Sequence, residues 1–176
     1  YGPQADAAVE AAVEEINRLD ALLSTGNEDS EVAGINANNG GHLSEDGAVL
    51  MERSLELYKS TGGVFDVAIY PVMKAWGFTD GNYQVPDAET LKSLLQLADP
   101  SLIEYDSSTA DVNFEEKGVQ IDFGGIAKGY TSSRIMDIYK EKGVTSGLVN
   151  LGGNAQVLGT KPDGSLWRVA VQSPDA

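Results

Sequence analysis

The sequence predicts an α+β fold in which helices pack on antiparallel sheet. Two observations carry this prediction. Apolar residues recur three or four positions apart in several segments, as in amphipathic helices, and short β-rich runs separated by turn residues follow one another, as in hairpins. The chain has 176 residues, of which 41% are hydrophobic, so it can bury a core without staples and we expect one domain.

Helical spacing and helix-boundary residues mark four segments. In the first segment one apolar stripe is formed by Val9, Val13, Ile16, Leu19 and Leu23. Ser44 and Asp87 stand where N-caps of the second and third helices are expected, and Gly143 closes the fourth. The expected helices are residues 5–23, 45–61, 88–98 and 127–142.

Two groups of short strands are expected between and after these helices. The first group, predicted to form an antiparallel meander, is residues 102–105, 111–114 and 119–122. The second group is residues 146–151, 155–160 and 166–172, the last two joined by the turn KPDG. The glycine- and asparagine-rich stretch 25–43 is expected to be a polar loop that can carry ligand contacts.

The chain is strongly acidic, with 12 basic and 27 acidic residues and a net charge of −15. This argues against nucleic acid or an anionic membrane as the partner of a broad surface, so an anionic ligand must be met locally. There is no cysteine, which excludes a disulfide, a thiolate nucleophile or a cysteine-ligated metal within the segment. The acidic residues expected to lie on solvated faces include Glu10, Glu14, Glu15, Glu115 and Glu116.

The most informative segment is QIDFGGIAKGY at residues 120–130. Adjacent glycines let a backbone approach a ligand, a helix N-terminus offers N–H groups to anions, and a lysine adds a mobile positive charge. Asp122 is placed to hydrogen-bond a ligand or to face a metal. The pattern suits a phosphate-bearing ligand, but it has neither dinucleotide-binding nor P-loop spacing, so a plain turn with a solvated Lys128 stays the alternative.

A second glycine cluster, VNLGGN at residues 149–154, follows one helix later and predicts a ligand cradle shared with the first. These two blocks, followed by GTKPDG and WRV and preceded by SEVAGIN at 30–36, TGGVFDV at 61–67 and WGF at 76–78, closely resemble the ApbE family of FAD:protein FMN transferases. The resemblance implies a T-fold-like arrangement. It covers nearly the whole chain, and we expect residues 1–176 to be a single ApbE-like domain that lacks its first strand and its C-terminal part.

The resemblance implies an activity. Such an enzyme binds FAD as its substrate, uses Mg²⁺ to neutralise the pyrophosphate, and transfers FMN to a threonine hydroxyl of a target protein with release of AMP. It also implies a periplasmic or extracytoplasmic location, with membrane contact only through a lipid anchor outside this chain. The alternatives are an FAD pyrophosphatase, in which water replaces the threonine, and a fragment that binds FAD without catalysis.

Carried over residue by residue, the resemblance implies cofactor-binding residues and a metal ligand. The cofactor-binding residues are Val64, Phe65, Asp66, Asp122 and Lys128, and the metal ligand is the backbone carbonyl of Gly125. Mg²⁺ prefers such hard oxygen donors. Catalytic residues, including a histidine, are expected in the missing C-terminal part.

Several residues keep a structural alternative. Phe65 also suits core packing, Asn36 a cap or turn, and Trp76 a buried corner in place of a flavin stack. His42, the single histidine, matches none of the family's positions and is expected to be a solvated loop residue. Gly26 stands where many family members carry an aromatic residue, which leaves the flavin ring without that stacking partner.

Overall fold

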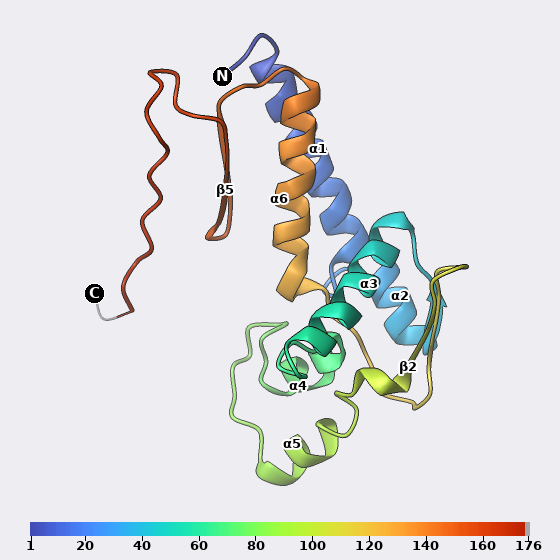
Figure 1. Ribbon diagram of the computed structural model, residues 1–176. Coiled ribbons are helices and arrows are strands. Elements are labelled where there is room, and N and C mark those ends of the chain that lie inside the picture. The colour runs from blue at the N-terminus through green and yellow to red at the C-terminus, as the bar shows by residue number, and fades with distance from the viewer. Residues whose placement is uncertain (175–176) are drawn as a thin grey trace. The chain divides into compact units, whose positions relative to one another are not determined.

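The computed structural model describes residues 1–174 and forms two compact units. The first unit combines Tyr1–Arg18 with the chain from Lys128 onward, and the second is Leu19–Ala127. The helices are α1 (Ala5–Leu23), α2 (Glu31–Asn38), α3 (Glu45–Ser60), α4 (Tyr70–Ala75), α5 (Ala88–Leu94) and α6 (Gly124–Glu141), with short 3₁₀ helices at Val67–Ile69 and Pro100–Leu102. The strands are β1 (Gly40–His42), β2 (Ile103–Asp106), β3 (Asp111–Phe114), β4 (Gly147–Leu151) and β5 (Asn154–Leu158) (Figure 1).

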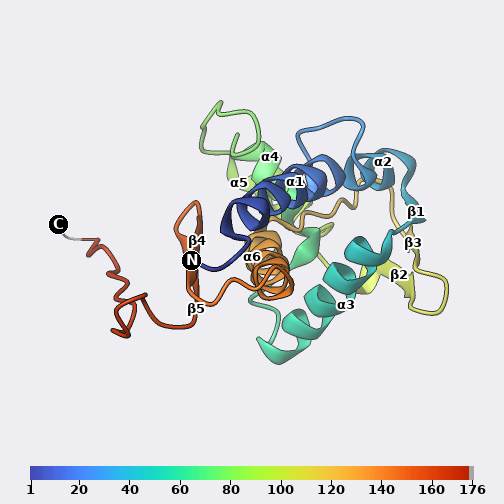
Figure 2. The same cartoon turned by 90° about the horizontal axis from the view of Figure 1, so that it is seen from above.

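In the first unit, the N-terminal part of α1 packs side by side with α6 (Figures 1 and 2). The buried residues of this core are Ala8, Ala12, Ile135, Met136, Tyr139, Val144 and Val149. The antiparallel hairpin β4–β5 pairs Gly147 with Leu158 and contributes Val149 to the core. Its two-residue turn requires glycine, because Gly152 and Gly153 both have positive φ, 56° and 93°.

The buried face of α1 agrees with the predicted stripe at Leu19 and Leu23, which are buried, and differs from it at Val9 and Val13. Val9 and Val13 are 53% and 50% exposed, whereas Ala8 and Ala12, one position earlier, are buried. Ala8 and Ala12 are four residues apart, as are Val9 and Val13, so helical spacing fits either pair. The larger valine side chains favour the wrong one of these two faces. In this core the small alanines face the buried side, where a helix packed close by leaves little room for a larger side chain.

Glu15 lies on α1, and the prediction of a solvated side chain there is wrong. Its side chain is 11% exposed and accepts hydrogen bonds from Arg18 at 2.8 Å and from Arg134 at 3.2 Å. The hydrogen bonds from Arg18 lower the pKa of Glu15 below its ordinary value, against the opposing effect of burial. The carboxylate therefore joins α1 to α6 within the first unit.

In the second unit, β1, β3 and β2 form an antiparallel sheet in that order. The predicted pairing of the second and third strands is confirmed, with Ile103 opposite Phe114 and Asp106 opposite Asp111. The third place is taken by β1, which lies in the stretch predicted to be a loop.

The stretch 25–43 is mostly helix and strand, so the loop prediction is wrong. Ser30 caps α2 by accepting a hydrogen bond from the Ala33 N–H at 3.0 Å, and Asn39 ends the helix in the left-handed conformation at φ 59°. The many glycines and asparagines in this stretch favour a loop, although Ser30 and Asn39 are also typical residues for the two ends of a helix.

Residues 119–122, predicted to be a strand, join no ladder. The Ile121 N–H donates to Asn36 Oδ1 at 2.8 Å, and Asn36 Nδ2 donates to the Ile121 carbonyl at 2.9 Å. The Asp122 N–H donates to the Val67 carbonyl at 2.9 Å. The amide of Asn36 thus satisfies both backbone groups of Ile121 that a neighbouring strand would satisfy. Asn36 therefore has a structural role, but this role is a long-range bridge and not the cap or turn given as its alternative.

The remaining predictions divide in the same way. Ser44 and Asp87 cap α3 and α5 as predicted, while α6 begins three residues earlier than expected. Residues 166–172 form no strand within the described chain, although the turn before them closes as predicted, with the Gly164 N–H donating to the Lys161 carbonyl at 2.9 Å. Helix α4 had no counterpart in the prediction.

Within residues 1–174, the helices are all too short or too polar to cross a membrane.

Replacing Asn36 by alanine is expected to destabilise the protein by about 2–4 kcal/mol, because the Ile121 N–H and C=O both lose their partner in a partly buried site. Asn38→Ala on the same helix is the matched control, since the Asn38 amide bonds only to the exposed Gly34 carbonyl. Its effect should stay within about 0.5 kcal/mol. Urea denaturation measures both, and equal effects of the two substitutions would contradict the role of Asn36.

Candidate functional site

Asp122 lies at the start of α6, where two donors hold its carboxylate. Oδ1 accepts a hydrogen bond from the Gly124 N–H at 2.7 Å, and Oδ2 accepts one from Thr25 Oγ1 at 3.1 Å. A Cβ on Gly124 would lie 2.7 Å from Oδ1, so a side chain there would displace the carboxylate. A carboxylate at this end of a helix is also favoured by the helix dipole.

Gly125 lies under the ring of Phe65 in the second unit. A Cβ on Gly125 would come within 2.9 Å of Phe65 Cε2, which is closer than packed atoms approach. Phe65 is half-buried, and its N–H donates to Thr61 Oγ1 at 3.1 Å. The ring therefore contacts the glycine turn and is not enclosed in the core, which leaves part of its face accessible to a ligand.

The neighbours of Phe65 have different environments. The Val64 side chain is 87% exposed. Asp66 accepts a hydrogen bond from the Ala68 N–H at 2.8 Å and so caps the 3₁₀ helix Val67–Ile69. Burial raises the pKa of Asp66; the bond from Ala68 opposes the shift, and the charge of Asp99 adds to it.

Lys128 belongs to the first unit and contacts the second glycine cluster. A Cβ on Gly152 would lie 3.2 Å from Lys128 Nζ, and one on Gly129 would lie 3.8 Å from Asn154 Nδ2. Lys128 and Gly129, at the end of the first block, therefore lie beside the second glycine cluster within the first unit. A ligand cradle shared by the two clusters stays a prediction. The predicted site residues divide between the units: Lys128 belongs to the first, and Val64, Phe65, Asp66, Asp122 and Gly125 belong to the second.

Three further polar residues surround Asp122 and were not predicted. Thr25 holds the carboxylate, and the Tyr70 hydroxyl donates to the Thr25 carbonyl at 3.3 Å. Gln120, two residues before Asp122, accepts a hydrogen bond from Lys74 Nζ. Thr25 is 97 residues from Asp122 in the sequence, and a local sequence pattern cannot predict a contact over that separation.

Oxygen donors suited to a divalent cation are few at this site. The Asp122 carboxylate and the Gly125 carbonyl belong to one turn, but residues 1–174 contain no group of three or more histidine, cysteine or acidic side chains able to hold a metal. This set fits the way Mg²⁺ is commonly held, by one or two carboxylates together with the phosphate oxygens of a substrate. It does not fit an all-protein metal cage.

Two other candidate residues have structural neighbours. Trp76 stacks on Phe78, with ring centroids 6.0 Å apart and 6° between the planes. Its predicted alternative, a buried residue filling this corner, is met only in part, because Trp76 is half-buried and Phe78 is exposed. His42 is exposed, as expected, but lies in β1, where its Nδ1 is 3.1 Å from Asp111 Oδ1.

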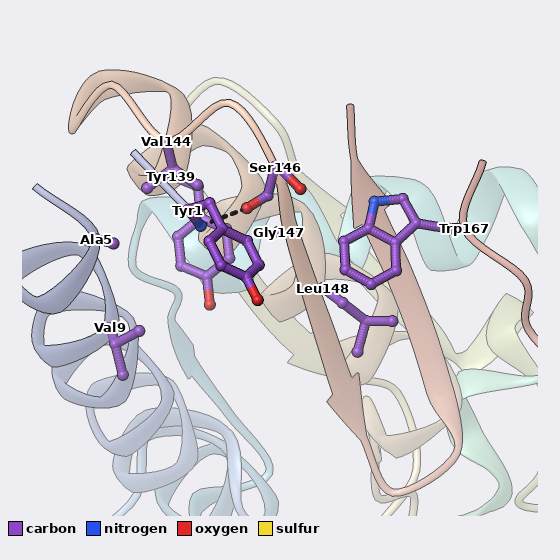
Figure 3. Close-up of a pocket in the computed structure, with 9 residues that line it drawn as sticks. All are labelled: Tyr1, Ala5, Val9, Tyr139, Val144, Ser146, Gly147, Leu148 and Trp167. Atoms are coloured by element: carbon purple, nitrogen blue, oxygen red, sulfur yellow. Dashed lines mark hydrogen bonds between the residues drawn. The ribbon is translucent and has the colours of Figure 1, made fainter. Parts of the chain in front are cut away.

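A separate pocket lies in the first unit, with a volume of about 190 Å³ (Figure 3). It is lined by Tyr1, Ala5, Val9, Tyr139, Val144, Ser146, Gly147, Leu148 and Trp167. Ser146 Oγ and Trp167 Nε1 are buried without a hydrogen-bond partner among the residues that the structure describes. The residues of the predicted site do not line this pocket. Its lining residues are far apart in the sequence, so no sequence pattern predicted the pocket.

Comparison with known proteins places this geometry in context. The model of the ApbE family matches residues 2–176. The chain is 30% identical over 164 residues to the FAD:protein FMN transferase of Klebsiella pneumoniae (strain 342), an alignment that covers 92% of this chain and 50% of that protein. It is 31% identical over 173 residues to the one of Treponema pallidum (strain Nichols), covering 92% and 48%. The chain thus spans about half the length of these relatives.

Solved structures show the same fold. The ApbE protein of Thermotoga maritima superposes with a TM-score of 0.89 at 29% identity, over 97% of this chain and 57% of that one. The flavinyl transferase ApbE of Pseudomonas stutzeri, in its apo form, gives 0.86 at 29% identity over the same shares. The expected combination of helices with antiparallel sheet is confirmed.

Replacing Gly125 by alanine is expected to destabilise the protein by about 1–3 kcal/mol through overpacking against Phe65. Gly34→Ala in α2 is the matched control, because a Cβ there meets nothing within 4 Å and should stabilise by about 0.5–1 kcal/mol. Adding Phe65→Leu to Gly125→Ala should recover most of the loss. Thermal or urea unfolding measures all three, and a Gly125→Ala protein as stable as Gly34→Ala would refute the contact.

Asp66 makes the stability of the protein pH-dependent. Because its pKa is raised in the folded state, its contribution to the free energy of unfolding is fully present below the ordinary pKa and is lost as pH rises through the raised value. Asp66→Asn keeps an acceptor for Ala68 and cannot titrate. The stability of this variant relative to the parent should therefore rise as the pH increases above the ordinary pKa of an aspartate. Urea titrations at several pH values test this, and a constant difference would contradict it.

Proposed function

The chain belongs to the ApbE family, and on this premise we propose that its protein moves FMN from FAD onto a threonine hydroxyl of an acceptor protein and releases AMP. The relatives named FAD:protein FMN transferase support the proposal, and the structural observation that carries it is the Asp122 turn. In that turn a fixed carboxylate, two glycines and the first turn of a long helix come together.

This turn suits a ligand that carries phosphate groups. The positive end of the helix dipole favours an anion, and glycine allows a ligand to approach the backbone closely. In α6 the Gly124 N–H already donates to Asp122, and the N–H groups of Ile126 and Ala127 donate to the Phe123 carbonyl. Asp122 cannot bind phosphate itself, but its orientation by Thr25 and Gly124 suits it to accept a hydrogen bond from the ligand or to contact a cation. Phe65 offers an apolar face beside the turn.

The proposed reaction is the transfer of a phosphorus-containing group. The threonine oxygen attacks the phosphorus of the FMN half of FAD, a new phosphoester bond forms, and the bond from this phosphorus to the AMP oxygen breaks. AMP leaves, and the hydroxyl proton passes to a base. The residues described here are assigned to binding and orientation of FAD, and no catalytic base is assigned among them.

Mg²⁺ is part of the same proposal, because a divalent cation neutralises charge on a pyrophosphate. The Asp122 carboxylate and the Gly125 carbonyl would hold it together with phosphate oxygens of the ligand. An extracytoplasmic location is also proposed, and it rests on family resemblance alone.

The test uses the longest natural form of the protein that contains this chain, with FAD, Mg²⁺ and a threonine-containing candidate acceptor. We expect the acceptor to gain the mass of FMN and AMP to appear in equal amount. Asp122→Asn, which keeps the size of the side chain, should reduce both products at least tenfold, about 1.4 kcal/mol in the transition state. Asp137→Asn, an exposed position on α6, is the control and should leave both unchanged.

The two products separate the possible outcomes. AMP without a gain in acceptor mass would identify an FAD pyrophosphatase when several acceptors have been tried. FAD binding without AMP would identify a binding protein. If the protein neither binds FAD nor releases AMP, the proposed function is wrong.

A further inference from the structure

Gln120 and Asp122 lie on one face of an extended segment. From Val119 to Phe123 the side chains alternate between buried and half-buried, so Val119, Ile121 and Phe123 face the core. This period of two places Gln120 and Asp122 together on the opposite, accessible side. The two side chains are held by different partners, Asp122 by Thr25 and Gln120 by Lys74.

Lys74 reaches this face from α4. Its Nζ donates to Gln120 Oε1 and lies 5.1 Å from the centre of the Tyr70 ring, one helical turn earlier. The Tyr70 hydroxyl donates to the Thr25 carbonyl, and Thr25 Oγ1 donates to Asp122. Two sets of contacts, one through Gln120 and one through Tyr70 and Thr25, therefore hold the ammonium group beside the face that carries Asp122.

The charge of Lys74 is oriented but not neutralised. Its hydrogen-bond partner is a neutral amide, whereas Arg53, in the same unit, pairs with the carboxylate of Glu56. None of the ion pairs described for residues 1–174 includes Lys74. Burial alone lowers the pKa of Lys74, and no carboxylate contributes to the shift. The side chain is exposed, so a ligand can reach it.

The ammonium group of Lys74 is thus oriented and unneutralised on a chain with a net charge of −15. A phosphate group beside it would recover the charge-assisted hydrogen bond that Gln120 supplies only in neutral form. We propose that Lys74 binds a phosphate group of the ligand at the face of Gln120 and Asp122, with Gln120 and Tyr70 as the residues that position it. This inference rests on the proposed function, and it adds a cation that the predicted site did not contain.

The test is the affinity of the longest natural form for FAD, compared with riboflavin, which has the same ring but no phosphate. Lys74→Met removes the charge and keeps the length of the side chain. Gln120→Glu keeps the size of its side chain and neutralises Lys74 in place. Each is expected to raise the Kd for FAD about tenfold and to leave the Kd for riboflavin unchanged. Lys92→Met, on α5 in the same unit, is the matched control and should not change the Kd for FAD.

Each outcome supports or overturns the inference. An equal rise in the Kd for FAD and in the Kd for riboflavin would show that Lys74 has only a structural role. A rise in the Kd for FAD with Lys74→Met but not with Gln120→Glu would lead to the same conclusion. An unchanged Kd for FAD in both variants would overturn the inference and leave the proposed function standing. If the parent protein does not bind FAD, the proposed function is wrong and the inference is wrong with it. Flavin fluorescence measures the Kd of each protein for each ligand, and circular dichroism checks that each variant is folded.

Discussion

Along residues 119–123 the amide of Asn36 takes the place of a neighbouring strand. It makes both hydrogen bonds that a ladder would make with Ile121, and the Val67 carbonyl receives the next N–H. With the backbone held in this way, the side chains alternate between the core and the accessible face. Gln120, which accepts from Lys74, and Asp122, which accepts from the first residue of α6, Gly124, flank the residue that this amide holds.

Features with a local cause could be predicted from the sequence. The caps Ser44 and Asp87 satisfy N–H groups within three residues, and the β2–β3 hairpin joins neighbours in the chain. The features that the sequence did not predict have one of two causes. Either the interacting residue is far away in the sequence, or two adjacent helix faces fit the same apolar spacing. Asn36 meets Ile121 across 85 residues, and no property of Asn36 itself distinguishes this role from that of a turn residue. On α1, alanines and valines one position apart both matched helical spacing.

The candidate site shows the same division. The motif around Asp122 and Gly125 predicted a glycine turn at the start of a helix, because acid, glycines and helix are neighbours in sequence. The side chains that complete its surroundings, Thr25 and Phe65, come from other parts of the chain. Phe65 was named only through the family resemblance of its block, and Thr25 was not named at all. Asp66 and Asp122 both accept hydrogen bonds from backbone N–H groups of the fold, so their structural and proposed ligand-binding roles share one carboxylate each.

The first unit is assembled from both ends of the chain, with α1 at one end and α6 and the β4–β5 hairpin at the other. The second unit is a continuous stretch, and its partners are all present once Ala127 has left the ribosome. Until α6 follows, Ala8 and Ala12 have no core to enter and their helix face is open to water. Synthesis therefore imposes an order on folding. Residues 19–127 can fold as they emerge, whereas the N-terminal part of α1 must wait for more than a hundred residues before a long chain loop can close.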